Sequence, residues 1–276
     1  MNIIKRIALA VLCLGITVAP LAARAADVYY TIGGNSVTKI FAIKFSHGKI
    51  TTTDVGPTNG GGCASLAMSK WGTLYSMCGN LFGAQQLATI DLNTGNANLF
   101  GTPVNGLAVM SIAFAPDGTL YAIGDCNPDP SHSFECHSGA DPNYNSLYTV
   151  DGSSGAFTRV GATGAPQYFM DLAFDRHGKM FGVTTTLNPS YTPAILYQLN
   201  LATGAATQIA ILIGSSQLMG LAFGEDGALY ATDFVNNPGL YLIDMKTGFQ
   251  TAIAALPFGF SSSLKLVKSD AKNDED

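Results

Sequence analysis

GLAFGEDGALYAT, residues 220–232, decides the fold, because related segments occur three times upstream with the same spacing of apolar residues and glycine. These segments are SLAMSKWGTLYSM (65–77), SIAFAPDGTLYAI (111–123) and DLAFDRHGKMFGV (171–183). In each, two short apolar runs surround a turn that ends in Gly. Alternating apolar runs on both sides of a turn whose Gly can take φ > 0 predict a β-hairpin.

A second hairpin follows each of the first. The segments are LATIDLNTGNANLFG (87–101), LYTVDGSSGAFTRVG (147–161), LYQLNLATGAATQIA (196–210) and LYLIDMKTGFQTAIA (240–254). All four turn at the pattern Asp/Asn-x-x-Thr/Ser-Gly. Two successive hairpins form a four-stranded antiparallel unit, which is one blade of a β-propeller.

A fifth copy is divided between the two ends of the chain. VYYTI (28–32) and IFAIKFSHGKITTTDVG (40–56) supply three strands, and SSLKLV (262–267) supplies the missing first strand. We therefore predict one all-β domain over residues 26–267, a five-bladed propeller whose ring is closed by the C-terminal strand. A β-sandwich gives no reason for a whole-blade repeat, and an open solenoid needs capping units.

The termini and the composition indicate export. Residues 1–25 join a short basic region to an apolar run and end in Ala-Arg-Ala, the pattern of a cleaved signal peptide. An uncleaved anchor is the alternative, but the apolar run is shorter than the roughly 20 residues of a spanning helix. We expect a periplasmic or extracellular protein with no membrane span after cleavage. Residues 268–276 form a charged tail that is expected to be disordered.

The charge and cysteine content limit the partners and the compartment. The chain has 14 Lys and Arg against 19 Asp and Glu, without a basic cluster, which excludes a nucleic-acid partner. Loss of the leader leaves four cysteines, an even number that suits two disulfides in an exported protein. Cys63 and Cys78 lie symmetrically about Lys70-Trp71, so a two-residue hairpin would pair them. The simplest second bridge is Cys126–Cys136, although four cysteines allow three connectivities.

The connections fall on two faces, because strands alternate in direction. With strands named a to d from the centre outward, the short a–b and c–d turns define the tight-turn face. The b–c and d–a connections define the long-loop face and are long and uneven: 79–86, 125–145 and 184–193, then 102–109, 162–169 and 211–218. Function concentrates in long loops on a rigid scaffold, so we expect any ligand on the long-loop face or in the channel beneath it.

Several candidate ligand-binding residues lie at strand ends on this face. The aligned column before the apolar core of strand a contains Ser65, Ser111, Asp171, Gly220 and Ser263, and the column before it contains Ala64, Met110, Met170, Met219 and Ser262. Asp171 is a candidate ligand, or a strand-end acid satisfied by backbone N–H groups, and the methionines suit packing between blades. Asp125 and Asp233 could be further carboxylates. Tyr144, Tyr168 and Tyr191 could stack on a sugar or anchor their loops.

The longest connection is a candidate metal site. It reads DCNPDPSHSFECHSGADPNYN (125–145) and contains the possible ligands Asp125, Asp129, His132, Glu135 and His137. A disulfide-closed loop with these oxygen and nitrogen donors could hold Ca²⁺ or another divalent ion. The same Asn-Pro and Asp-Pro content is also typical of a solvated, turn-rich loop.

The combined repeat, LAF-x-x-x-G-x-LY followed by LY-x-[IL]-[DN]-x-x-TG, resembles that of exported bacterial β-propellers with YVTN-, NHL- and quinoprotein-like repeats. The resemblance covers nearly the whole mature chain and implies blades, on a fold that hosts hydrolases, lyases, lectins and interaction platforms. Quinoprotein repeats carry a Trp after the Thr-Gly turn that locks the blades. The only Trp here is Trp71, on the tight-turn face, so no quinone cofactor is expected.

The sequence favours an exported, non-enzymatic propeller that binds a protein, a glycan or a small molecule with its long-loop face. The alternative is a hydrolase or lyase that uses Asp125, Asp171 and Asp233 around a divalent ion in the channel. A purely structural envelope or matrix component is a third possibility. Carboxylates that converge on one point would favour the enzyme, whereas a binding module needs only an exposed surface.

Overall fold

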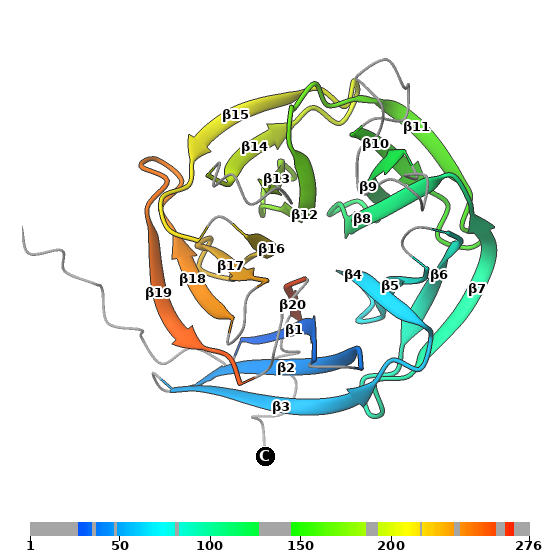
Figure 1. Cartoon of the computed structure of the whole chain (residues 1–276), viewed down its shortest axis with the longest axis horizontal. Helices are drawn as coiled ribbons and strands as arrows, with labels where there is room; N and C mark the ends of the chain where they lie inside the picture. Colours follow the sequence, from blue (N-terminus) through cyan, green and yellow to red (C-terminus); the bar gives the residue numbers. More distant parts are fainter. Residues whose placement is uncertain are drawn as a thin grey trace, which may run out of the picture.

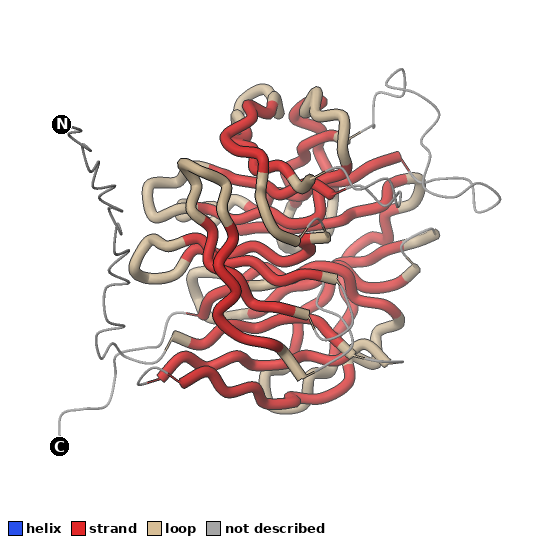
Figure 2. The backbone as a smooth tube through the Cα atoms, turned by 60° about the vertical axis from the view of Figure 1, so that its left-hand side comes forward, coloured by secondary structure: helices blue, strands red, loops and turns tan. Residues whose placement is uncertain are grey.

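The structure is a computed structural model of the 276-residue chain. It describes residues 27–34, 37–46, 49–80, 83–126, 145–185, 193–215, 217–234, 238–257 and 263–267. The strands form five four-stranded antiparallel sheets, arranged as blades around a central axis (Figure 1). Figure 2 shows that strands make up most of the described backbone and that short loops join them at both ends of the sheets.

The strands of each blade run outward from the centre in the order a to d. Blade 1 contains β20 (Lys265–Val267), β1 (Val28–Gly33), β2 (Lys39–Ser46) and β3 (Lys49–Pro57). Blade 2 contains β4 (Gly62–Met68), β5 (Leu74–Gly79), β6 (Gln85–Ile90) and β7 (Ala97–Val104). Blade 3 contains β8 (Leu107–Phe114), β9 (Leu120–Cys126), β10 (Ser146–Val150) and β11 (Phe157–Ala162).

The last two blades follow the same plan. Blade 4 contains β12 (Tyr168–Phe174), β13 (Met180–Thr185), β14 (Ile195–Leu199) and β15 (Ala206–Ile211). Blade 5 contains β16 (Leu218–Phe223), β17 (Leu229–Asp233), β18 (Gly239–Ile243) and β19 (Gln250–Ala255). Strand β20 pairs with β1 in the register Val28↔Val267 and Tyr30↔Lys265, so the C-terminal strand closes the ring. The predicted five-bladed propeller and its closure are confirmed.

The core lies between the blades. Each of the five clusters of buried apolar side chains draws its members from two neighbouring blades, as Leu87 of blade 2 and Ile112 of blade 3 illustrate. The apolar residues that alternate along strands a to c therefore face the next blade. Burial of this surface holds the blades together.

The rim of the ring is joined by close backbone approach. A Cβ placed on Gly161 of β11 would lie 2.1 Å from the carbonyl oxygen of Thr203, in the β14–β15 turn of the next blade. Gly101 of β7 has the same relation to Ser154, at 2.6 Å, and the Thr102 N–H donates to the Ser154 carbonyl at 2.8 Å. Glycine at these outer-strand positions lets the c–d turn of the neighbouring blade make contact.

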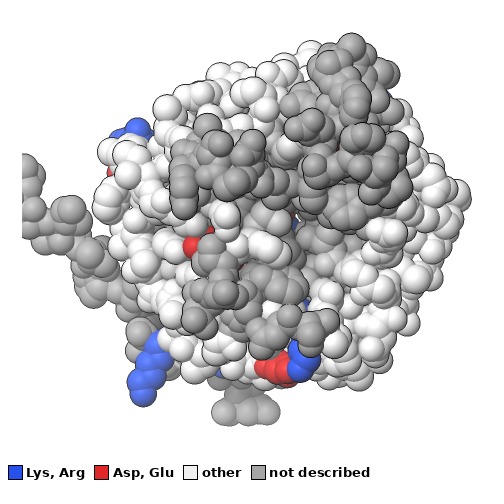
Figure 3. Space-filling model, viewed as in Figure 1, with Lys and Arg blue, Asp and Glu red and all other residues white. Residues whose placement is uncertain are grey.

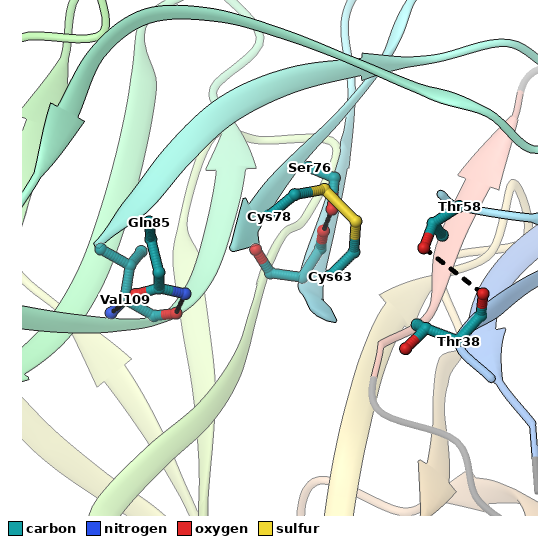
Figure 4. Close-up of a disulfide and its surroundings, with 8 residues drawn as sticks. Thr38, Thr58, Cys63, Ser76, Cys78, Gln85 and Val109 are labelled. Carbon is teal, nitrogen blue, oxygen red and sulfur yellow. Dashed lines mark hydrogen bonds between the residues drawn. A yellow bond between two sulfur atoms is a disulfide. The ribbon is translucent and has the colours of Figure 1, made fainter. Parts of the chain in front are cut away.

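The predicted disulfide Cys63–Cys78 is confirmed (Figure 4). The predicted two-residue turn between these cysteines is wrong. The turn has three residues, 70–72, because the Ser69 N–H donates to the Thr73 carbonyl. The pairing register shifts between Cys63 and Ser65, so one extra residue is accommodated in β4. The longer turn and the bulge offset one another, which returns Cys63 to a position opposite Cys78.

The same shift recurs in the inner strands of blades 3, 4 and 5. The residues skipped by the pairing are Ala64, Met110, Met170 and Met219. The sequence column expected to pack between blades is therefore a column of β-bulges. A bulge redirects the side chain that follows it, and here those side chains are the Ser65, Ser111, Asp171 and Gly220 column.

Candidate functional site

Asp171 lies at the centre of the ring and joins four blades directly. Its side chain is fully buried on β12. Its Oδ1 accepts a hydrogen bond from the Ser111 hydroxyl of blade 3 at 2.6 Å, and its Oδ2 accepts one from the Leu221 N–H of blade 5 at 2.7 Å. The Leu264 N–H and the Ser263 hydroxyl, which precede β20 of blade 1, also donate to Oδ2. Asp171 is thus a hub for the inner strands.

Blade 2 joins the same network through Ser263. The Leu66 N–H of β4 donates to the Ser263 Oγ at 3.1 Å. The Ser65 hydroxyl of the same strand is buried and has no hydrogen-bond partner among the described residues. All five inner strands therefore meet in one polar network around the Asp171 carboxylate.

Lys265 on β20 is the counter-ion of Asp171. Its Nζ lies 2.9 Å from the Asp171 Oδ1 and also donates to the carbonyl oxygens of Leu172 and Leu221. Burial raises the pKa of the Asp171 carboxyl and lowers the pKa of the Lys265 ammonium, while the attraction between the two charges opposes both shifts. Asp171, which the sequence offered either as a channel ligand or as a strand-end acid satisfied by backbone N–H groups, is held in the described residues by backbone donors and by the Lys265 ion pair.

Asp125 lies at the base of the longest connection. It is buried at the end of β9, where its Oδ1 accepts a hydrogen bond from the Asn145 N–H at 3.2 Å. The Asn145 side chain in turn donates to the carbonyls of Ala165 and Gln167 in the connection that leads to blade 4. Asn145 takes φ 44°, a left-handed conformation that Asn tolerates better than most residues. These contacts fix the base of the loop against the next blade.

Asp233 has the equivalent place in blade 5. It is 2% exposed at the end of β17, and its two oxygens accept hydrogen bonds from the Gly239 N–H at 2.7 Å and the Tyr241 hydroxyl at 2.8 Å. Burial, and then the hydrogen bond to Asp233, raises the pKa of Tyr241 to about 12. Asp233 thereby holds the two ends of the β17–β18 connection together.

The candidate carboxylates that the structure describes, Asp125, Asp171 and Asp233, do not form one metal-binding cluster. Among the described residues, no group of three or more His, Cys, Asp and Glu side chains could hold a metal ion. The described members of the binding set, Asp125, Asp171 and Asp233, have the separate partners given above. Tyr168 is half-buried at the start of β12, opposite Thr185.

Other candidates lie outside the described residues. These are Tyr144, Tyr191, Asp129, His132, Glu135, His137 and the partner Cys136 of the second predicted disulfide, together with the leader 1–25 and the tail 268–276. The described residues contain no helix with the length and hydropathy of a membrane span. The Cys63–Cys78 disulfide is consistent with an exported protein.

Phe234 is a candidate that the sequence analysis missed. It directly follows Asp233 on the long-loop face and is 44% exposed, while its N–H donates to the Gln217 carbonyl at 2.8 Å. The signal in the sequence is an aromatic residue immediately after the end of a strand b. In the view of Figure 3, the described surface is mostly uncharged.

Comparisons with known proteins support the fold and leave the function open. No protein-family model matches the chain, and no curated protein sequence matches it. Among solved structures, TolB from Acinetobacter baumannii is similar, with a TM-score of 0.51 and 16% identity over 87% of this chain. This chain spans about half, 54%, of that TolB chain.

Gluconolactonase structures are similar to the same degree. A gluconolactonase from Xanthomonas campestris has a TM-score of 0.50 and 12% identity, covering 85% of this chain and 78% of its own. A second structure, described as a putative gluconolactonase, has a TM-score of 0.50 and 13% identity, covering 87% of this chain and 85% of its own. At identities this low, structural similarity shows only a shared propeller fold, and the same fold occurs in proteins with unrelated functions.

Proposed function

We propose that this protein is an exported, non-enzymatic binding module whose long-loop face engages a protein, a glycan or a small molecule. The observation that carries the proposal is the use made of its carboxylates. Asp171 neutralises Lys265 in the closed centre of the ring, and Asp233 is bound by Gly239 and Tyr241 at the base of a loop. Both acids hold the scaffold together, whereas a channel hydrolase would need them aimed at a substrate.

The bases of two long connections are rigid. Asp125 and Asn145 tie the base of the 127–144 connection to the segment that leads to blade 4. Asp233 holds the two ends of the 234–238 connection together within blade 5. The described residues at these bases are therefore held in a fixed arrangement by the ring. Such pre-organisation reduces the entropy that binding must overcome.

Phe234 supplies a contact point on this face. Its exposed ring follows the rigid Asp233 position, and its backbone is fixed by Gln217. Aromatic side chains on rigid backbone provide large contact area at a low conformational cost, and they dominate the energetics of many interfaces. We propose Phe234 as the central contact of the binding surface, with Asp233 as the positioning residue directly before it in the chain. Asp125 has a separate positioning role, at the base of the blade 3 connection.

A ligand screen with matched variants tests this proposal. The mature, disulfide-bonded chain is screened against arrays of glycans and peptides, and each hit is measured by calorimetry with Phe234→Ala and with Leu99→Ala. Leu99 is 47% exposed on the outer strand β7 and serves as the control. We expect Phe234→Ala to weaken binding about tenfold or more and Leu99→Ala to leave it unchanged.

Two outcomes would overturn the proposal. If Phe234→Ala binds every hit as the unaltered chain does, the ligand does not contact this part of the face. If mass spectrometry shows that a hit is converted to product, and if the conversion stops after chelation, the hydrolase or lyase hypothesis replaces the binding module.

A further inference from the structure

The tight-turn face has an exposed aromatic ring that the proposed function does not use. Trp71 is the only Trp of the chain and is 74% exposed at the tip of the β4–β5 turn. The turn itself is fixed by three hydrogen bonds among its backbone groups and the Ser69 hydroxyl. The ring therefore adds little to the core, yet it projects from a rigid base.

Lys70 is placed against the ring of Trp71. Its Nζ lies 4.8 Å from the ring centroid, within the range of a cation–π contact. A Cβ placed on Gly118 would lie 3.6 Å from the same Nζ, so Lys70 also reaches the β8–β9 turn of blade 3. Asp117 in that turn has a lowered pKa, chiefly because the Thr119 N–H donates to it, with a smaller contribution from Lys70. The ammonium group is thus fixed beside the ring and near the surface.

The neighbouring turn of blade 4 extends this surface with further cations. A Cβ on Gly178 would lie 3.9 Å from the Pro116 ring, so the turns of blades 3 and 4 adjoin. Arg176 and Lys179 in the blade 4 turn are exposed, whereas Asp175 accepts backbone hydrogen bonds within it. Blade 5 differs, because its turn carries Glu225 and Asp226.

This arrangement fits one ligand chemistry. A flat, exposed aromatic ring packs against the apolar face of a sugar, and the cations of adjoining turns can pair with carboxylates repeated along a polymer. An acidic peptide supplies carboxylates but no flat apolar face for the Trp71 ring, and the residues of the β4–β5 and β8–β9 turns are charged, small or Pro, so they add no further apolar contact. We propose that Trp71, Lys70, Arg176 and Lys179 form a second binding surface, on the tight-turn face, for an acidic polysaccharide built of sugar acids.

Fluorescence of the single Trp tests the proposal directly. A galacturonic acid oligomer is titrated into the mature chain, with the neutral galactose oligomer and polyglutamate as comparison probes. We expect a saturable change in emission with the galacturonic acid oligomer only. The apparent affinity should fall as salt is added, because exposed ion pairs are screened.

Variants assign the contact to named residues. By calorimetry, Trp71→Ala should weaken binding about tenfold or more, and Lys70→Ala or Arg176→Ala should weaken it by about threefold to tenfold. Lys246→Ala, an exposed cation in the β18–β19 turn of the same face, is the matched control and should bind normally. Phe234→Ala should also bind normally, which separates this surface from the long-loop face.

Three results would overturn the inference. The first is the absence of any emission change or heat with the galacturonic acid oligomer. The second is equal binding of polyglutamate, which would make the surface a general anion site. The third is normal binding by Trp71→Ala, which would place the ligand elsewhere.

Discussion

The centre and the rim of this ring are joined in different ways. At the centre, one carboxylate, Asp171, connects four blades directly and a fifth through Ser263, with Lys265 as its counter-ion. At the rim, each contact joins only two neighbours, as where Gly161 of β11 meets the carbonyl of Thr203. At the centre, the stabilisation that holds the blades together depends on one buried ion pair. At the rim, it is shared among many small contacts between neighbouring blades. Damage should therefore be global at the centre and local at the rim.

Loss of the counter-ion at the centre should have the largest effect. Lys265→Met leaves the Asp171 carboxylate buried without its partner, and removal of one member of a buried pair costs about 3–5 kcal/mol. Urea unfolding at neutral pH measures the loss of unfolding free energy. The double variant Asp171→Asn/Lys265→Met should lose less than the sum of the single variants, because the two residues interact. If Lys265→Met lowers the free energy of unfolding by less than about 1 kcal/mol, the ring does not depend on this ion pair.

A single methyl group at the rim should cost less. Gly161→Ala places a Cβ against the Thr203 carbonyl and forces the β14–β15 turn away from β11, at about 1–3 kcal/mol. Gly152→Ala is the control, because no atom lies within 4 Å of a Cβ at that position. Differential scanning calorimetry should show a lower Tm for Gly161→Ala alone. Equal Tm values for the two variants would show that the contact between Gly161 and the Thr203 carbonyl does not contribute to stability.

The base of the blade 5 loop should respond by a still smaller amount. Asp233→Asn weakens the hydrogen bonds to Tyr241 and Gly239, which should cost about 1–2 kcal/mol. The pKa of Tyr241, raised to about 12, should move toward the usual 10.0. Because the folded-state pKa is raised, the stabilisation from Tyr241 is complete below pH 10 and is lost as the pH rises toward 12. The absorbance of tyrosinate as a function of pH measures the pKa of Tyr241, and the Tyr241→Phe variant identifies its signal. If the titration of Tyr241 is the same in Asp233→Asn as in the unaltered chain, the prediction is wrong.

Substitutions in the exposed turns of the rim should have the smallest effect on stability, and that effect should depend on pH. Hydrogen bonds from Ser153 and Ser154 lower the pKa of Asp151, and bonds from Thr247 and Lys246 lower that of Asp244. Depressed values mean that their stabilisation is present above the usual 3.8 and is lost as the pH falls below it. Asp151→Asn/Asp244→Asn should therefore have a slightly lower Tm at pH 7 and the wild-type Tm in strong acid. A Tm difference independent of pH would count against this assignment.

Much of the fold could be predicted because the repeat is local. Each hairpin can be predicted from its own alternation of apolar residues and its own turn residues. The blades could therefore be predicted without knowledge of any long-range contact. The pairing of Cys63 with Cys78 was predicted correctly from a turn of the wrong length, because the bulge at Ala64 offset the extra turn residue. Bulges leave only a faint trace in one sequence, here the Met110, Met170 and Met219 column.

The candidate site was less predictable, because its partners are distant in the chain. Asp171 stood out as the single acid of its column, but its ion pair with Lys265 spans 94 residues and exists only when β20 closes the ring. Asp233 was read as a possible ligand, and only the return of β18 shows that Tyr241 and Gly239 occupy its oxygens.

The sequence by itself determined the number of blades, the division of one blade between the termini, and the two faces on which the connections fall. These properties depend on periodicity and turn chemistry, which act over a few residues. The tertiary structure decided what each polar side chain does, from the Asp171 hub to the rigid loop bases and the surface around Trp71. A carboxylate has the same chemistry in any strand, and its role depends on which donors the closed ring brings within hydrogen-bond distance.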